Sequence, residues 1–410
     1  MSLYRTIEES QTLLINNQSK ELEGQKKKIF KFGFGQSPFL PPVEVMSQLK
    51  DNVHHKEYSS VQGDPELRKL VAEFHHHVNG INVKADNVLI APGSKVLIFT
   101  ILSAFKKADV LIPAPAWVSY APQSKLAGHN SIAVETFFNN RWRVTPESIE
   151  KAFAQKKHEA TIMILNFPGN PDGLTYSEQE LKRIADKARE LNILVISDEI
   201  YALLSHGNEH HSLAKFYPEK TITTTGLSKW CGAGGWRLGV ALLYEGIEED
   251  FRKALLGIAS ETYSCAPTPI QIAARLAYSN IQTSLEYVSK QNKILKEIGH
   301  FCYAELKKAN LLLHEPEGGF YLFPDFSNYL DKLAKIGINT SSALCERILE
   351  DTGVALLPSS AFGLDKNYLA ARLSYVDFDD PIHIKDFELK RDCPRVVEGI
   401  NELTKWLSKL

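Results

Sequence analysis

Lys229 and Arg237 are the first residues of this chain whose types and setting suggest chemistry. Both stand in the stretch GLSKWCGAGGWRLG (226–239), where Arg237 follows Lys229 by eight positions across glycine-rich sequence. A dinucleotide-binding loop, a surface turn and a covalent cofactor site would each explain such a stretch. The dinucleotide loop is disfavoured, because Gly232 and Gly234 do not complete the G-x-G-x-x-G pattern and no helix is expected to begin there. The turn and the cofactor site remain open on these residues alone.

More polar side chains follow runs of apolar residues that we predict to be buried strands. Four such runs are apolar on both faces, as strands of a parallel sheet are: NVLIA (87–91), DVLIP (109–113), TIMIL (161–165) and ILVIS (193–197). The third run leads into NFPGNPDG (166–173), which carries Asn170, and the fourth into DEIY (198–201). An unpaired carboxylate at the end of a buried strand is costly, so Asp198 needs a cationic or hydrogen-bonding partner, and Tyr201 is placed to face the same cavity. Alternatively, Asp198 caps a helix and Asn170 belongs to an ordinary loop.

A further polar cluster follows the first run. PGSK (92–95) is a glycine turn that opens a helical run, and its free backbone N–H groups make an anion site. Lys95 lies in the first helical turn, where a cation is unfavourable unless an anion binds nearby; otherwise it is a solvated surface lysine. Together, Lys229, Arg237 and Asp198 provide what pyridoxal phosphate requires: an amine for a Schiff base, a cation for the phosphate and an acid for the ring nitrogen.

The elements that must position these residues alternate between strand and helix. TITTT (221–225) and RLGVALL (237–243) are expected to be strands on either side of the lysine. The stretch 177–191 has one apolar helical face and begins with a capping box formed by Ser177 and Glu180. This alternation predicts an α/β fold with a mainly parallel sheet covered on both faces. Its ligands are expected beyond the carboxyl ends of the strands.

The pattern changes beyond about residue 281. A long charged helix is predicted over 281–309. Short strand-like runs follow it: GGFYLF (318–323), GVALLP (353–358) and ARLSYV (371–376). This part is expected to form a smaller α+β domain. We predict a large cofactor-binding domain over 46–290, and a small domain with an N-terminal arm over 1–45 and 291–410.

The composition argues against several function classes. The chain has 410 residues, with 47 Lys and Arg against 49 Asp and Glu, so no basic excess indicates nucleic acid or an anionic membrane. The longest apolar stretch, 96–105, is too short to span a bilayer, and no signal peptide is expected. Five scattered cysteines without a CxxC pair favour a reducing cytoplasm. His75, His76 and His77 point around a helix, so we expect them at the surface and predict no metal site.

In order along the chain, its motifs resemble those of the class I/II aminotransferases, which are fold-type I pyridoxal-phosphate enzymes. The similar segments are GFGQSPF (33–39), YSSVQGDPELR (58–68), PGSK, PAPAWVSY (113–120), NFPGNPDG, DEIY, SKWCGAGGWRLG, LPSSAFG (357–363) and ARLS (371–374). Their sequences most resemble those of the bacterial-type aspartate aminotransferase branch. The resemblance implies a three-layer large domain, whose sheet is mainly parallel, and a smaller α+β domain.

The resemblance also implies roles for individual residues. Lys229 would link covalently to the cofactor and move a proton between substrate and cofactor, with Asp198 at the ring nitrogen and Tyr201 with Asn170 at the ring oxygen. Further cofactor contacts are implied for Ser94, Lys95, Trp117, Ser228 and Arg237, and for Tyr58 toward the neighbouring subunit of a homodimer. Substrate contacts are implied for Gly35, Lys95, Trp117, Asn170 and Arg372, whose guanidinium suits an α-carboxylate.

The implied activity is transfer of an amino group between an L-amino acid and a 2-oxo acid by a ping-pong mechanism. Aspartate or glutamate is favoured where Lys95 contacts a distal carboxylate, as in the resembling branch. The chain departs from the family at Asp172, where threonine is common, and at Gly226, where several members have a hydroxyl. Another fold-type I reaction, such as that of a C–S lyase or a synthase, and a non-catalytic regulatory protein on this scaffold are the alternatives.

Overall fold

A seven-stranded sheet forms the centre of the molecule. The computed structural model describes residues 11–207 and 209–410. Its strands are β1 (Val88–Ala91), β2 (Ala108–Ala114), β3 (Asn130–Glu135), β4 (Ala160–Asn166), β5 (Leu194–Asp198), β6 (Thr221–Gly226) and β7 (Gly239–Leu242), in the order β1-β7-β6-β5-β4-β2-β3. Neighbouring strands are parallel, except that β7 runs antiparallel to β1 and β6. The mainly parallel α/β sheet predicted from the sequence is confirmed.

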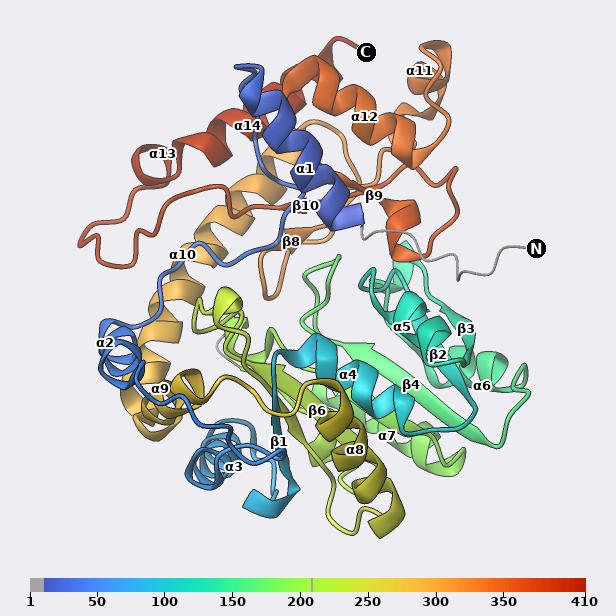
Figure 1. The fold of residues 1–410 in the computed structure, drawn as a ribbon. Coiled ribbons are helices and arrows are strands. Elements are labelled where there is room, and N and C mark those ends of the chain that lie inside the picture. The colour runs from blue at the N-terminus through green and yellow to red at the C-terminus, as the bar shows by residue number, and fades with distance from the viewer. Residues whose placement is uncertain (1–10, 208) are drawn as a thin grey trace.

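Helices cover both faces of this sheet, which makes three layers (Figure 1). The α-helices of the described residues are α1 (Gln11–Gly24), α2 (Val43–Asn52), α3 (Pro65–Asn79), α4 (Ser94–Ser103), α5 (Tyr120–Leu126), α6 (Pro146–Phe153), α7 (Glu178–Glu190), α8 (Glu249–Thr262), α9 (Thr268–Ser279), α10 (Ile281–Lys308), α11 (Leu330–Lys335), α12 (Ser341–Thr352), α13 (Leu389–Asp392) and α14 (Pro394–Ser408). Successive strand residues point to opposite faces. Ile162 of β4 therefore packs in one core with α4 and α8, whereas Met163 packs in another with α6 and α7.

The helix α7 begins where the sequence predicted. The Ser177 hydroxyl accepts a hydrogen bond from the Glu180 backbone N–H, and the Glu180 carboxylate accepts one from the Ser177 backbone N–H. The apolar residues of α7 keep one face of the helix on the sheet, and all four are buried there: Leu181, Ile184, Ala185 and Ala188. The capping box and the periodicity together fix α7, and so the connection between β4 and β5 that carries Asn170.

A second, three-stranded sheet lies above the first one in Figure 1. Its strands are β8 (Tyr321–Leu322), β9 (Leu357–Pro358) and β10 (Ala371–Ser374), in the order β8-β10-β9. The helix α10 packs against β8 and α12 against β9, and α14 packs on both helices. The helix α1 packs near β9, as expected for the N-terminal segment. The predicted boundary between 290 and 291 falls inside the continuous helix α10, and the division of the chain into two domains stays a prediction.

The prediction that His75 lies at the surface is wrong. His75 is 4% exposed in α3, where its ring packs against Phe74 and Tyr278 at centroid distances of 5.4 Å and 6.2 Å. Neither ring nitrogen has a hydrogen-bond partner, and burial lowers the pKa of His75 to about 4. His76 and His77 are exposed as expected. The apolar face of α3 takes in the first histidine of the run because its position, one after Phe74, falls on that face.

Three searches of the described residues bear on other classes of protein. None of the helices they form is long and apolar enough to cross a membrane. No cluster of three or more His, Cys, Asp or Glu side chains among them is arranged to hold a metal ion. The five cysteines are all unpaired, and four of them are buried.

Candidate active site

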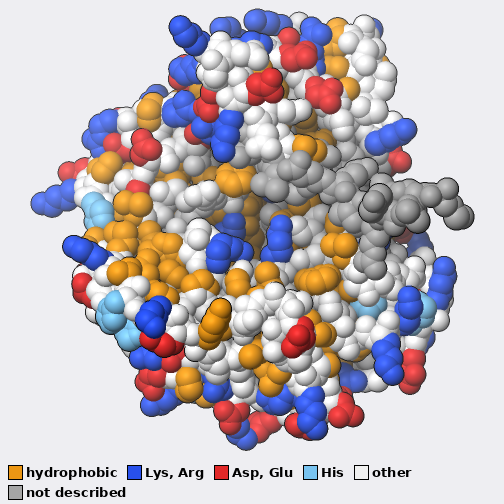
Figure 2. Space-filling view, viewed as in Figure 1, with side chains coloured by type: hydrophobic (Ala, Val, Ile, Leu, Met, Phe, Trp, Pro, Cys, Tyr) orange, Lys and Arg blue, Asp and Glu red, His pale blue; other side chains and the backbone are white. Residues whose placement is uncertain are grey.

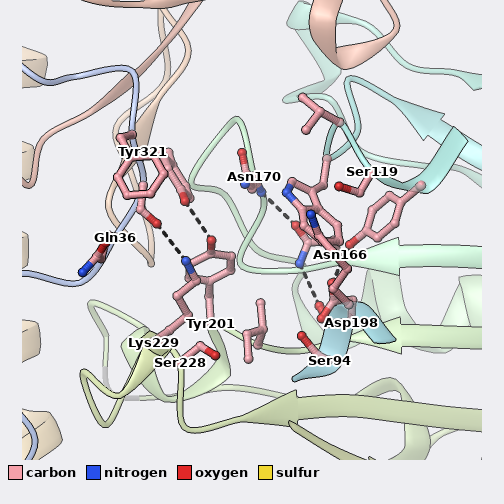
Figure 3. Close-up of a pocket in the computed structure, with 18 of the residues that line it drawn as sticks. Gln36, Ser94, Ser119, Asn166, Asn170, Asp198, Tyr201, Ser228, Lys229 and Tyr321 are labelled. Atoms are coloured by element: carbon pink, nitrogen blue, oxygen red, sulfur yellow. Dashed lines mark hydrogen bonds between the residues drawn. The ribbon is translucent and has the colours of Figure 1, made fainter. Parts of the chain in front are cut away.

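A cavity of about 460 Å³ opens at the carboxyl edge of the large sheet, below the smaller sheet (Figure 3). The register pairs Asn166 at the end of β4 with Asp198 at the end of β5, and Gly226 of β6 with Gly239 of β7, so these strand ends share one edge. Predicted site residues that line the cavity are Gly35, Ser94, Lys95, Trp117, Asn170, Asp198, Tyr201, Ser228, Lys229, Arg237 and Arg372. Figure 2 shows basic side chains in the hollow between the upper and lower parts of the molecule.

Tyr58 is the one predicted site residue that does not line this cavity. Its side chain is 89% exposed and borders a separate depression that also includes Arg275 and Gln271. A residue that reaches a neighbouring subunit would be exposed in a single chain. The predicted role of Tyr58 stays a prediction.

Lys229 lies on the connection between β6 and β7 and points into the cavity. Its Nζ donates a hydrogen bond to the Gly35 carbonyl at 2.8 Å, and it lies 5.4 Å from the ring centroid of Tyr201. Burial and the nearby Arg372 lower the pKa of Lys229 to about 7. A substantial fraction of this amine is therefore neutral near pH 7, which is what a nucleophile or a general base requires.

Asp198 is a buried acid held by hydroxyl groups. Its carboxylate accepts hydrogen bonds from Tyr120 at 2.6 Å and from Thr224 at 3.2 Å, and it is 3% exposed. No cationic side chain of the described residues pairs with it. Burial raises the pKa of Asp198 to about 6 despite these two hydroxyl donors. The sequence predicted a hydrogen-bonding or cationic partner for Asp198. The partners in the structure are hydrogen-bonding ones, the hydroxyl groups of Tyr120 and Thr224.

Arg237 and the start of α4 form an anion-binding end of the cavity. Ser94 is the first residue of α4, and the Arg237 guanidinium lies across this helix start, donating to the Pro92 carbonyl at 3.1 Å. A Cβ atom on Gly93 would stand 2.2 Å from an Arg237 nitrogen, so glycine is required there for this approach. Free N–H groups at a helix start and a guanidinium next to them are the groups that bind a phosphate.

Lys95 adds a second cation at this end. Its Nζ lies 5.0 Å from the ring centroid of Trp117, and its side chain stays exposed to solvent. Partial burial of the ammonium and the charge of Arg237 lower the pKa of Lys95. An anion bound between the two cations would relieve this repulsion.

Arg372 lines the cavity from β10, a strand of the smaller sheet. It is 1% exposed and donates to the Asn170 side-chain oxygen at 3.1 Å and to the Gly33 carbonyl at 2.6 Å. Its Nε is buried without a hydrogen-bond partner, and no carboxylate of the described residues pairs with the guanidinium. Burial lowers the pKa of Arg372. The guanidinium thus has unmet donor capacity that a carboxylate can fill with two parallel hydrogen bonds.

Five polar residues of the cavity wall were given no role from the sequence: Gln36, Ser119, Tyr120, Asn166 and Tyr321. Asn166 donates to the Asp198 carbonyl and accepts from the Asn170 backbone N–H, both at 2.8 Å, so it ties the two strand ends together. Tyr120 and Asn166 stand inside motifs already singled out, and the common sheet edge of β4 and β5 was the available signal for Asn166. Tyr321 lies in the strand-like run GGFYLF (318–323), but no local pattern placed this run at the cavity, because it belongs to the smaller sheet.

The departure at Asp172 has a partner outside the cavity. Asp172 is 8% exposed and forms an ion pair with Arg143, which is 3% exposed. Its other carboxylate oxygen accepts from the Leu174 backbone N–H at 3.1 Å. The pair braces the turn that carries Asn170, and a threonine at this position would leave the Arg143 guanidinium buried without its counter-ion.

The cavity gathers four basic side chains around one buried carboxylate. Lys95, Lys229, Arg237 and Arg372 line it, against Asp198 alone. This imbalance favours a ligand that carries more than one negative charge. The cavity brings together the groups suited to a phosphate, an Arg372 guanidinium that has no carboxylate partner among the described residues, and an amine of pKa about 7.

Comparison with known proteins identifies the family. The model described as aminotransferase class I and II matches residues 27–377. This chain belongs to the class I and II aminotransferases. The aspartate aminotransferase of Bacillus sp. (strain YM-2) is 31% identical over 380 residues, covering 90% of this chain and 93% of the relative. That of Bacillus subtilis (strain 168) is 30% identical over 375 residues, covering 89% and 91%.

A solved structure supports the fold of this aminotransferase. The aspartate aminotransferase of Thermus thermophilus with maleate is 24% identical and has a TM-score of 0.85, covering 98% of this chain and 100% of that one. The predicted enzyme class is confirmed: the protein is a pyridoxal-phosphate-dependent transaminase that acts on an amino acid and a 2-oxo acid. The relatives do not favour a lyase, a synthase or a regulatory protein.

The cavity fits this cofactor by its own chemistry. It offers an amine, an acid whose pKa is raised by burial to about 6, and a helix start crossed by a guanidinium. These are groups for an aldehyde, a ring nitrogen and a phosphate, respectively. The cavity volume of about 460 Å³ also lies within the range of small-molecule sites.

Proposed function

We propose that this aminotransferase binds pyridoxal phosphate on Lys229 and moves the amino group of aspartate or glutamate to a 2-oxo acid such as 2-oxoglutarate. The observation that supports it best is the convergence of Lys229, Asp198 and Arg372 on one cavity. In this proposal Ser94, Ser228 and Arg237 hold the phosphate, with Lys95 beside them. Trp117 covers the ring, and Asn170 and Tyr201 contact its oxygen.

Asp198 and Lys229 have different tasks in the reaction. When bound, the cofactor accepts the electron pair that is left when the α C–H bond of the substrate breaks. Asp198, a carboxylate that is 3% exposed, would hold a proton on the ring nitrogen. Lys229, once released, takes the α-proton as a general base, for which a pKa of about 7 is well placed.

The substrate is oriented by its charges. Arg372 binds the α-carboxylate through the donors that the protein leaves unpaired. Lys95 lines the same cavity, and in this proposal it contacts the distal carboxylate of aspartate or glutamate. The names of the two Bacillus relatives agree with this substrate class.

The first experiment is a visible absorbance spectrum of the purified protein, recorded before and after adding each of a panel of amino acids. We expect a cofactor band that aspartate and glutamate change, and a Lys229→Ala variant that lacks both the lysine-linked band and turnover. A Lys229→Ala variant that still transaminates at the wild-type rate would contradict the assignment.

Lys95 is tested by substrate choice. The Lys95→Ala variant should lose about tenfold or more in kcat/KM for aspartate, since one charge-assisted hydrogen bond contributes about 1.5–3 kcal/mol, and much less for alanine. Equal losses of kcat/KM for both amino acids would show that Lys95 does not bind the distal carboxylate.

We also propose that the protein is a cytoplasmic homodimer in which Tyr58 reaches the neighbouring subunit. Its five cysteines are unpaired, as is usual in a reducing compartment. Leu40, Val43 and Val53 are exposed apolar side chains near α2, close in sequence to Tyr58, and burial in a dimer would remove them from water. Sedimentation equilibrium tests the assembly, and a monomer at micromolar concentration would contradict it.

A further inference from the structure

We propose that Tyr321 is a positioning residue that sets how strongly Tyr201 hydrogen-bonds to the bound cofactor. The inference rests on the proposed role of Tyr201 at the ring oxygen of the cofactor. The two tyrosine hydroxyls lie 2.8 Å apart in the cavity wall, and Figure 3 shows them facing each other beside Lys229. They come from different parts of the chain: Tyr201 follows β5, and Tyr321 begins β8.

The capacity of a hydroxyl group determines the direction of this bond. Each tyrosine hydroxyl has one proton to donate. When Tyr201 donates its proton to the cofactor oxygen, it can only accept from Tyr321. Tyr321 therefore donates to Tyr201, and Tyr201 donates to the cofactor. In such a chain each bond polarises the next, and the strengthening is roughly 10–30% per bond.

The surroundings of Tyr321 leave its hydroxyl this one partner. Tyr321 is 1% exposed, and among the described residues only Tyr201 is hydrogen-bonded to its hydroxyl. A Cβ atom on Gly35 would stand 2.0 Å from the Tyr321 hydroxyl oxygen, so the absence of a side chain at Gly35 makes room for it. The two tyrosine rings meet edge to face at 5.5 Å and 82°, which fixes the approach of the hydroxyls.

The ring of Tyr321 has a separate contact. The Arg372 guanidinium carbon lies 4.8 Å from the ring centroid, so the ring supports the arginine while the hydroxyl supports Tyr201. A Tyr321→Phe substitution keeps the first contact and removes only the second. This separation makes the proposal testable without disturbing the binding of the substrate carboxylate.

The test follows the visible absorbance of the holoenzyme as a function of pH. Tyr201 stabilises negative charge on the cofactor oxygen, so weakening its hydrogen bond makes deprotonation of the lysine-linked cofactor harder and raises the pH midpoint. We expect Tyr201→Phe to raise the midpoint by about one pH unit. Tyr321→Phe should raise the midpoint by about 0.3 unit, because one polarising bond contributes up to about 30% of the strength of the next bond. The KM for the amino acid should stay at the wild-type value in Tyr321→Phe.

Two controls complete the design. Tyr375 is buried beside the same segment, with its backbone N–H bonded to Phe320 at 3.1 Å, but it does not line the cavity, so Tyr375→Phe should leave the midpoint unchanged. The double variant of Tyr201 and Tyr321 should match Tyr201→Phe alone, because Tyr321 acts only through Tyr201.

Each alternative outcome overturns a stated part of the proposal. A midpoint in Tyr321→Phe equal to that of wild type, while Tyr201→Phe raises it, removes the role of Tyr321 and leaves the proposed function standing. An additional shift in the double variant shows that Tyr321 does not act through Tyr201. An unchanged midpoint in Tyr201→Phe overturns the proposed role of Tyr201, and with it this inference.

Discussion

Arg143 and Arg372 are two buried arginines that the protein treats in opposite ways. Arg143 has an ion pair with Asp172, donates from Nε to the Arg141 carbonyl at 2.8 Å, and donates from Nη1 to the Thr175 carbonyl at 3.2 Å. Arg372 has two neutral oxygen partners, no carboxylate among the described residues, and a buried Nε that is unpaired. One guanidinium is fully satisfied by the fold and the other is not.

The pKa shifts show the same contrast. Burial acts to lower the pKa of both arginines, but the Asp172 carboxylate raises the pKa of Arg143 overall, whereas that of Arg372 stays lowered. A buried cation without a counter-ion is expensive. Of these two arginines, only Arg372, which faces the cavity, bears that cost. The difference indicates that Arg143 stabilises the fold and that Arg372 is available to bind a negatively charged ligand.

The largest expected effect is the loss of activity in Arg372→Met. Removing the guanidinium should lower kcat/KM for aspartate by about 10³-fold, since a buried charge pair with substrate is worth about 2–5 kcal/mol. The melting temperature should change little or rise, because no carboxylate of the fold loses a partner. Kinetics and thermal unfolding of the same preparation measure both, and a cofactor band as in wild type is the control.

The matched substitution at Arg143 should have the reverse profile. Arg143→Met leaves Asp172 buried without its counter-ion and should cost about 3–5 kcal/mol of the free energy of unfolding. The double variant Arg143→Met with Asp172→Leu should recover most of that loss, because no buried charge remains. Urea unfolding measures the three proteins. If Arg143→Met is as stable as wild type, or if Arg372→Met is equally destabilised, the comparison fails.

His75 extends the comparison with a smaller effect. It is a buried basic group without a partner, and it stays neutral because its pKa is lowered to about 4 from an ordinary value of 6.5. The unfolded chain binds a proton below pH 6.5 that the folded chain does not, so this group's contribution to stability is present above pH 6.5 and is lost as the pH falls toward 4. Between pH 7 and 5 the loss should be about 2 kcal/mol.

The variant His75→Leu isolates that effect. Its unfolding free energy should fall less than that of wild type between pH 7 and pH 5, by about 2 kcal/mol, because leucine binds no proton in either state. Urea unfolding at the two pH values makes the measurement. Parallel pH profiles for wild type and variant would show that His75 is not the group responsible.

Local sequence patterns predicted the large sheet well and the cavity wall in part. Apolar runs identified β1, β2, β4 and β5, and the rule that ligands bind beyond parallel strand ends placed Asn170 and Asp198 in one cavity. Those inferences depend only on residues near each other in sequence or at one sheet edge.

The rest depends on contacts between distant segments, which no local pattern contains. The hydroxyls of Tyr120 and Tyr321 meet Asp198 and Tyr201 across 78 and 120 positions. The sequence showed Asp172 only as a departure from the family pattern. Its ion-pair partner, Arg143, lies 29 positions away and could not be predicted from local sequence. The surface prediction for His75 failed because the run of three histidines was taken as wholly polar, whereas His75 lies on the buried, apolar face of α3.

Borohydride reduction of the holoenzyme, followed by mass mapping of the peptides, tests the central claim most directly. Reduction makes the bond between lysine and pyridoxal phosphate permanent, and every lysine of the chain is then compared in one experiment. We expect one cofactor per chain, on Lys229, and none on the neighbouring Lys95. A reduced cofactor on Lys95 or on any other lysine, or no incorporation at all, would contradict the account.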